Sequence, residues 1–163
     1  MNAPLPSHLR FDIHGLAQAI NHCHASDALI CKFSVADWEI LAAHMQPFAL
    51  GGGQVLIEQG ANDRTLYFVE SGTLSVHRED DRSRIRRAFI SSGSVVGEGT
   101  FFSLQPRIAT VQASGDCKLW FLSFARFLEL SNCHCAIALE LTLALGAVMA
   151  KRLYIRPKRV AVT

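Results

Sequence analysis

The sequence has little net charge and no recognisable export segment. Among its 163 residues, Lys and Arg total 16 and Asp and Glu total 14, which gives a formal net charge of +2. A charge this small provides no electrostatic argument for a nucleic acid partner, and we expect none. The chain also lacks a basic start followed by an unbroken apolar segment, so no secretory signal is predicted.

The cysteines and the apolar stretches also lead us to expect a cytoplasmic protein without a membrane span. The five cysteines are odd in number and have no secretory context, so we interpret them as reduced thiols of a cytoplasmic protein. The apolar stretch 135–149 has 15 residues and is interrupted by Glu140. A membrane-spanning helix needs about 20 apolar residues, so we predict no membrane span.

Sequence patterns of common enzymes are missing. We find no P-loop, kinase signature or nucleophile elbow. A metal enzyme of cupin type would need two histidines one residue apart on a strand, with a glutamate and a later histidine. Only His77 occurs in the region that reads as strands. We therefore predict no catalytic residues, no metal site, no cofactor and no enzymatic activity.

What the sequence does contain is a regular series of short strands flanked by helices. Between residues 48 and 122, apolar stretches alternate with turns at positions such as Gly60, Gly72 and Gly93. This spacing predicts a sandwich or barrel of jelly-roll type. Helices are predicted at 34–45, with Ser34 as N-cap, and at 124–154, with the longer helix over 135–154 ended by Pro157. The class is therefore α+β, mainly β.

The segment GEGTFFSLQPRIATV, residues 97–111, organises the rest of the chain. Gly97 has no Cβ, so a ligand can approach its backbone, and the amides that follow open a short helix and favour an anion. Arg107 can fold back beside the same point and offers a planar fork of donors suited to phosphate. Glu98 can accept a hydrogen bond from a sugar hydroxyl. Together these groups predict a site for a sugar phosphate.

This segment resembles the phosphate-binding cassette of cyclic nucleotide-binding domains. The family includes bacterial catabolite activator proteins, regulatory subunits of cAMP-dependent kinase and cyclic-nucleotide-gated channels, and the resemblance extends over about residues 33–153. It implies a β-roll, or double-stranded β-helix, that carries the cassette between two strands and has helices at both ends. It also implies that Glu98 binds the ribose 2′-hydroxyl and that Arg107 binds the cyclic phosphate of cAMP or cGMP.

Three positions of the predicted site depart from the family pattern or refine it. Gly99 replaces an apolar residue, and a glycine loosens a helix start by about 0.5–1 kcal/mol. Thr100 replaces a small residue and can either add a hydroxyl to the phosphate site or cap the helix. Ile108 follows the arginine where family members that prefer cGMP often carry a threonine, so the sequence favours cAMP.

The resemblance implies a domain over 33–163, preceded by an extension over 1–32 with a helix of its own. The helix at 135–154 is apolar nearly all round, which predicts burial on more than one side and contact with a second copy or a partner protein. Residues 157–163 are too few for the DNA-binding domain of catabolite activators, so we expect a sensor without its own output. The alternative is an interaction module that has lost its ligand, in which Glu98 and Arg107 form an ordinary ion pair.

Overall fold

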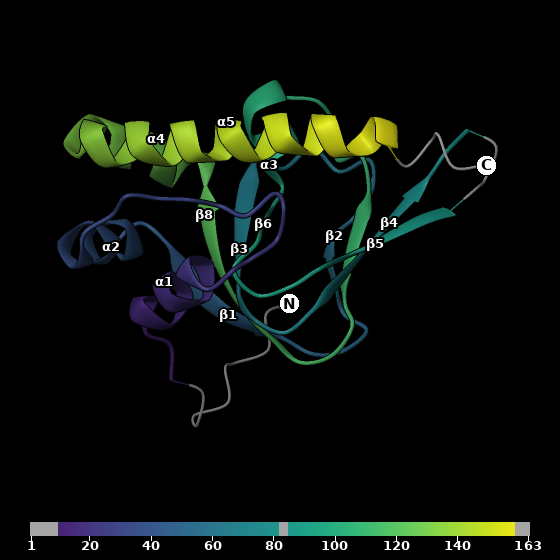
Figure 1. The fold of residues 1–163 in the computed structure, drawn as a ribbon, viewed down its shortest axis with the longest axis horizontal. Helices are drawn as coiled ribbons and strands as arrows, with labels where there is room; N and C mark the ends of the chain where they lie inside the picture. The colour runs from purple at the N-terminus through teal and green to yellow at the C-terminus, as the bar shows by residue number, and fades with distance from the viewer. Residues whose placement is uncertain (1–9, 82–84, 159–163) are drawn as a thin grey trace.

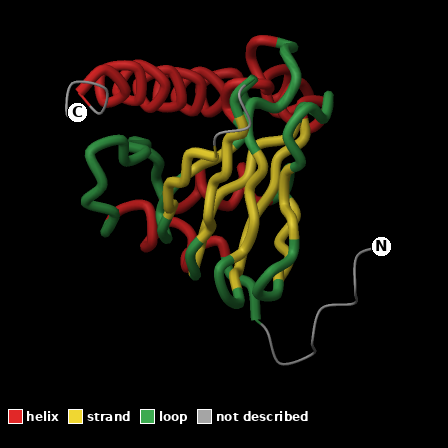
Figure 2. Tube along the Cα trace, turned by 90° about the vertical axis from the view of Figure 1, so that its right-hand side faces the viewer, coloured by secondary structure: helices red, strands yellow, loops and turns green. Residues whose placement is uncertain are grey.

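The computed structural model describes residues 10–81 and 85–158, so the first nine residues of the predicted extension lie outside it. In the described residues, eight strands form two four-stranded antiparallel sheets (Figure 2). One sheet has the order β1 (Gln46–Leu50), β8 (Cys117–Ser123), β3 (Thr65–Ser71), β6 (Val95–Val96), and the other has the order β2 (Val55–Ile57), β7 (Thr110–Ala113), β4 (Leu74–Glu79), β5 (Ile85–Ile90). The α+β, mainly β class and the β-roll are confirmed.

One apolar core fills the space between the two sheets. Strand β7 alternates between partly buried and buried positions, the period-two pattern of a half-buried strand, whereas β8 is buried on both faces. Residues from both sheets meet in this core: Ile57, Val69, Leu74, Val96, Val111, Ala113, Cys117 and Leu119.

A second core joins the helices to the outer face of the β1–β8–β3–β6 sheet. The helices are α1 (Ile13–Asn21), α2 (Val35–Ala42), α3 (Glu98–Ser103), α4 (Phe124–Cys133) and α5 (Cys135–Lys158). Figure 1 shows α5 as a long rod across one end of the strands, with α1 and α2 to the side of the roll. Phe68 and Trp120 of the sheet pack in one cluster with Leu16 of α1, Leu41 of α2 and Leu145 of α5.

Helix α2 begins as predicted and ends earlier. Ser34 is its N-cap and forms a capping box with Asp37, which confirms the predicted start. The amides of His44 and Met45 bond to carbonyls three residues earlier, which tightens the chain into a turn just after the helix. The helix therefore stops at Ala42 instead of continuing to residue 45.

Helix α5 is longer than predicted. It continues through Pro157 to Lys158, so the prediction that this proline ends the helix is wrong. A proline removes one N–H donor and crowds the carbonyl four residues earlier. In the last turn of a helix this affects a single hydrogen bond, and the helix can end one residue beyond the proline.

Within the described chain α5 is buried on one side, so the predicted burial of a second side against another copy or a partner protein stays a prediction. One side is buried, with Leu141, Leu145 and Val148 in the core. The opposite side carries exposed apolar residues: Leu139, Leu143, Leu153 and Tyr154. None of the helices in the described ranges combines the length and apolar character that crossing a membrane requires.

The N-terminal segment between α1 and α2 runs back along α5. The backbone amide of Lys32 donates to Glu140 of α5 at 2.9 Å. Burial, together with the nearby Glu140 charge, raises the pKa of the Cys31 thiol to about 12, so this cysteine stays protonated. This segment therefore fixes the position of α5 over the roll.

Candidate functional site

Gly97 stands at the turn into α3, and the structure requires glycine there. Its φ angle is +93°, in the left-handed region that side chains rarely adopt. A Cβ at this position would lie 2.6 Å from both the Arg107 Nη1 atom and the Thr65 carbonyl oxygen. The first helical bond runs from the Phe101 amide to the Gly97 carbonyl at 3.2 Å, so the amides of residues 98–100 open the helix. Arg107 thus lies beside Gly97 as predicted, while the predicted approach of a ligand to this backbone stays a prediction.

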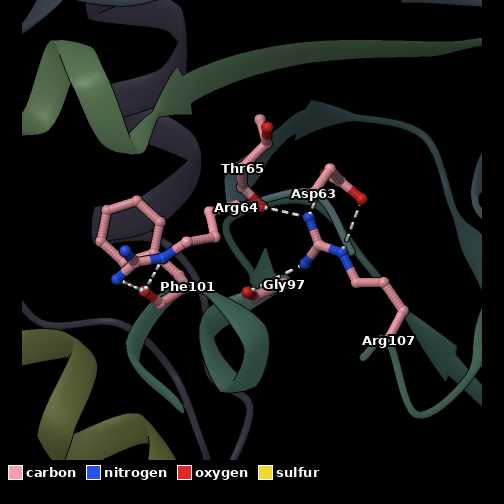
Figure 3. Close-up of polar contacts among 6 residues, drawn as sticks. All are labelled: Asp63, Arg64, Thr65, Gly97, Phe101 and Arg107. Carbon is pink, nitrogen blue, oxygen red and sulfur yellow. Dashed lines mark hydrogen bonds and ion pairs between the residues drawn. The ribbon is translucent and has the colours of Figure 1, made fainter. Parts of the chain in front are cut away.

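Hydrogen-bond acceptors from two backbone carbonyls and one carboxylate surround the guanidinium of Arg107 (Figure 3). Its Nη1 donates to the Gly97 carbonyl at 3.0 Å and its Nη2 to the Thr65 carbonyl at 2.8 Å. Nε and Nη2 also donate to the two carboxylate oxygens of Asp63, at 3.1 and 2.5 Å. Bonds to described residues thus occupy four of the five guanidinium N–H groups. The cation is only 3% exposed and has a fixed orientation.

Asp63 is the charged partner of this arginine. The hydrogen bond from Arg107 holds the pKa of the Asp63 carboxyl below its ordinary value, against the opposing effect of burial. The Asp63 side chain is 47% exposed, whereas that of Arg107 is 2% exposed. The pair is therefore open to solvent on the carboxylate side only.

Glu98, the second residue of the predicted site, is bound to the C-terminal helix. Its Oε1 accepts from Arg152 Nη1 of α5 at 2.6 Å. Arg152 also donates from Nε to Asp27 at 2.7 Å and from Nη2 to the Val95 carbonyl at 2.9 Å. Burial acts to lower the pKa of the Arg152 guanidinium, but the carboxylates of Glu98 and Asp27 outweigh it and raise the pKa.

The alternative in which Glu98 and Arg107 pair with each other is wrong. Each has a different ionic partner: Arg152 for Glu98 and Asp63 for Arg107. The two residues nevertheless lie near each other, because Arg107 bonds the carbonyl of Gly97, the residue just before Glu98. Their opposite charges are therefore compensated by separate partners.

The other predicted residues differ in accessibility. Gly99 faces open space, since a Cβ there would have no described heavy atom within 4 Å. Thr100 is 6% exposed inside α3, and because Gly97 is the N-cap, Thr100 does not cap the helix. Ile108 is 52% exposed and follows the buried arginine.

Sequence reasoning missed Asp63, Asp27 and Arg152. Their partners are 44, 125 and 54 residues away for the pairs Asp63–Arg107, Asp27–Arg152 and Glu98–Arg152. Contacts of this kind depend on how distant parts of the chain pack together, and no local sequence pattern predicts them.

Comparison with known proteins decides the family. The family described as cyclic nucleotide-binding domain matches residues 48–133, which is more than half of the chain and includes the whole cassette. The chain belongs to the cyclic nucleotide-binding domain family.

Relatives of this cyclic nucleotide-binding domain include bacterial transcription regulators. It is 32% identical over 118 residues to the cAMP-activated global transcriptional regulator Vfr of Pseudomonas aeruginosa, covering 69% of this chain and 53% of that protein. It is 26% identical over 126 residues to the cAMP-activated global transcriptional regulator CRP of Escherichia coli, covering 76% of this chain and 57% of that protein. The chain thus matches little more than half the length of these relatives.

The fold has solved counterparts. A cyclic nucleotide-binding domain from Methylobacillus flagellatus KT superposes with a TM-score of 0.80 at 19% identity, covering 91% of this chain and 82% of that one. At this identity the likeness concerns the fold, which agrees with the β-roll and helices described above.

Proposed function

We propose that this protein is a regulatory sensor that binds a cyclic nucleotide, with cAMP preferred over cGMP. The observation that carries the proposal is the buried Arg107, whose guanidinium is fixed beside Gly97 and the first amides of the cassette. A cation that is already oriented loses little further freedom when an anion binds, which favours tight binding. The sensor itself carries out no chemistry on the nucleotide, and we expect it to act in the cytoplasm.

Arg107 would bind the cyclic phosphate. One of its N–H groups is not used by described residues, and the cassette amides of residues 98–100 follow Gly97, whose carbonyl Arg107 bonds. Asp63 neutralises part of its charge but faces solvent, so the cyclic phosphate competes with Asp63 for the guanidinium. The affinity therefore depends on how much of the Asp63 interaction is retained.

Glu98 would accept a hydrogen bond from the ribose 2′-hydroxyl. Its carboxylate is already bonded to Arg152, and a carboxylate has lone pairs for more than one donor. A bound ribose would therefore join Glu98 and Arg152 in one network, which connects the ligand directly to α5. This is the route by which occupancy would alter the C-terminal helix.

The preference for cAMP rests on Ile108 and on the relatives. Ile108 is exposed and apolar, so it offers no hydrogen bond to a guanine. The two transcription regulators compared above are named as cAMP-activated.

The exposed side of α5 would bind a second copy of this chain. Its exposed apolar and small residues recur at alternating intervals of three and four, at Ala136, Leu139, Leu143, Gly146, Ala150 and Leu153. This is the spacing of the contact line in a two-stranded coiled coil. A homodimer would bury this line, and a different partner protein is the other possible occupant.

One observation favours the competing function, an interaction module without nucleotide. Both predicted ligand residues already have ionic partners within the chain, so the site is internally satisfied. In that case α5 would still form its interface, and Arg107 would serve only to stabilise the cassette.

Calorimetric titration separates the two functions. The purified chain is unfolded and refolded to remove carried-over ligand, then titrated with cAMP, cGMP and cyclic di-GMP. We expect micromolar or tighter binding of cAMP, with weaker binding of cGMP. No heat and no thermal shift with any of the three would refute the sensor function and leave the interaction module.

A further inference from the structure

Arg64 lies between the end of the cassette helix α3 and the beginning of α4. Its Nε and Nη2 donate to the carbonyl of Phe101 at 3.0 and 2.6 Å (Figure 3). Phe101 is among the last four residues of α3, and the carbonyls of such residues have no partner within the helix itself. The Leu104 amide bonds the Thr100 carbonyl, and Arg64 supplies the donors for the Phe101 carbonyl. A cation there also complements the helix dipole. Arg64 therefore closes the C-terminal end of the cassette helix.

The same residue holds the first residue of α4. The Cζ atom of Arg64 lies 3.3 Å from the centroid of the Phe124 ring, a cation–π contact. The backbone amide of Phe124 donates to the Arg64 carbonyl at 3.0 Å. Side chain and backbone thus both connect Arg64 to the start of α4.

The two neighbours of Arg64 in the sequence hold the ligand arginine. Asp63 bonds to Arg107 through its carboxylate, and Thr65 does so through its carbonyl. Consecutive Cα atoms are about 3.8 Å apart, so a shift of Arg107 that moves Asp63 or Thr65 also moves Arg64. The tripeptide 63–65 therefore connects the anion site with α3 and α4.

Aromatic packing alone does not define this junction. The fully buried Phe101 ring makes edge contacts with Phe124 at 5.3 Å and Phe127 at 5.4 Å between centroids. Such apolar contacts hold α3 against α4 but are weakly directional. The two hydrogen bonds from Arg64 to a single carbonyl are directional, so they orient α3 relative to α4 in a way that the ring contacts do not.

We propose that Arg64 is a positioning residue that clamps α3 to α4 and transmits occupancy of the Arg107 site to the C-terminal helices. The transmission part rests on the proposed cyclic nucleotide function; the clamp does not. A ligand that draws Arg107 away from Asp63 would shift the 63–65 segment, and Arg64 would carry this shift to both helices. The ligand moves the helices only as far as its affinities for the two arrangements differ.

Hydrogen exchange on the ligand-free protein tests the clamp. The variants are Arg64→Lys, which keeps the charge and loses the planar fork, and Arg64→Ala, which loses both. The matched control is Arg126→Lys, since Arg126 lies on α4 but bonds to Glu129 and the Ala43 carbonyl. We expect amides over 101–104 and 124–127 to exchange about two- to tenfold faster in Arg64→Lys than in the wild type, the range that follows from losing one hydrogen bond of ordinary strength.

The same variants with cAMP test the transmission. We expect cAMP to slow exchange over 124–133 in the wild type and in Arg126→Lys, and to do so much less in Arg64→Lys, although all three bind cAMP within about threefold of one another. If Arg64 had only a structural role, Arg64→Lys would lower the stability of the protein. It would not reduce the response of α4 to cAMP while leaving the affinity for cAMP unchanged.

The outcomes are distinguishable. Unchanged exchange over both segments in ligand-free Arg64→Lys and Arg64→Ala would overturn the clamp. An equal response of α4 to cAMP in wild type and Arg64→Lys would overturn the transmission. If the wild type binds no cyclic nucleotide, the proposed function and the transmission both fail, and the ligand-free exchange still decides the clamp.

Discussion

Arg152 Nη1 lies 2.6 Å from Glu98 Oε1, which joins the last long helix to the first residue of the cassette helix. The two side chains are 20% and 14% exposed. The same guanidinium is shared with Asp27, so three segments of the chain meet at one cation. Removal of Arg152 would leave two carboxylates without their partner.

Arg152→Ala should therefore destabilise the fold by about 3 kcal/mol, the lower end of the cost of breaking a buried pair. The control Arg126→Ala removes an exposed pair with Glu129 and an exposed bond to the Ala43 carbonyl, and should cost about 0–1 kcal/mol. Urea denaturation of both variants measures the difference. Equal losses of stability would show that the Glu98–Arg152–Asp27 network is not held as described.

Two glycines of the cassette should respond in opposite directions to alanine. Gly97→Ala forces a side chain into a left-handed φ of +93° and against Arg107 and Thr65, so it should cost about 1–3 kcal/mol and weaken cAMP binding. Gly99→Ala meets open space in a helix and should stabilise by about 0.4–1 kcal/mol. Thermal denaturation and calorimetry of both variants measure these effects. A stabilising Gly97→Ala would contradict the described turn.

Asp63 gives the stability a defined dependence on pH. Its carboxyl has a lowered pKa, so its contribution is complete above the ordinary value of 3.8 and is lost as the pH falls through the folded-state value. We expect Asp63→Asn to lower the Tm by about 2–4 °C at pH 7, which corresponds to about 1 kcal/mol in a chain of this size. The difference between the two proteins should shrink as the pH falls below the ordinary value of 3.8, because the unfolded chain then takes up a proton that folded Asp63 resists. A difference that stays constant from pH 7 to pH 3 would argue against the Asp63–Arg107 pair.

The exposed line on α5 predicts self-association. Leu143→Glu places a charge in the middle of that line and should convert a dimer to a monomer in sedimentation equilibrium. Val55→Glu is the control, because Val55 is a similarly exposed apolar residue outside α5. A wild-type monomer over the accessible concentration range would contradict the proposed homodimer.

The sequence was informative where the determinants are local. The regular spacing of turns and apolar stretches predicted a sandwich or barrel of jelly-roll type, and the family resemblance implied the β-roll. Ser34 and Asp37 predicted the start of α2. The prediction that Arg107 folds back beside Gly97 agrees with the bond between them. Long-range partners could not be predicted in this way. Asp63 and Arg152 become partners of the cassette only when β3 and α5 pack beside it, which depends on the whole core. The same is true of Arg64, whose role requires the ends of two helices to meet.

The central claim is that Arg107 binds the phosphate of a cyclic nucleotide. The most direct test is calorimetric titration with cAMP of the wild type, Arg107→Ala, and Arg107→Lys, which keeps a charge opposite Asp63 if the alanine variant fails to fold. Arg126→Ala serves as the arginine control. We predict micromolar or tighter binding by the wild type and the control, and a loss of about 2–5 kcal/mol in binding free energy for folded Arg107 variants. Unchanged cAMP affinity in folded Arg107→Lys or Arg107→Ala would contradict the assigned site, and no binding by the wild type would contradict the sensor function.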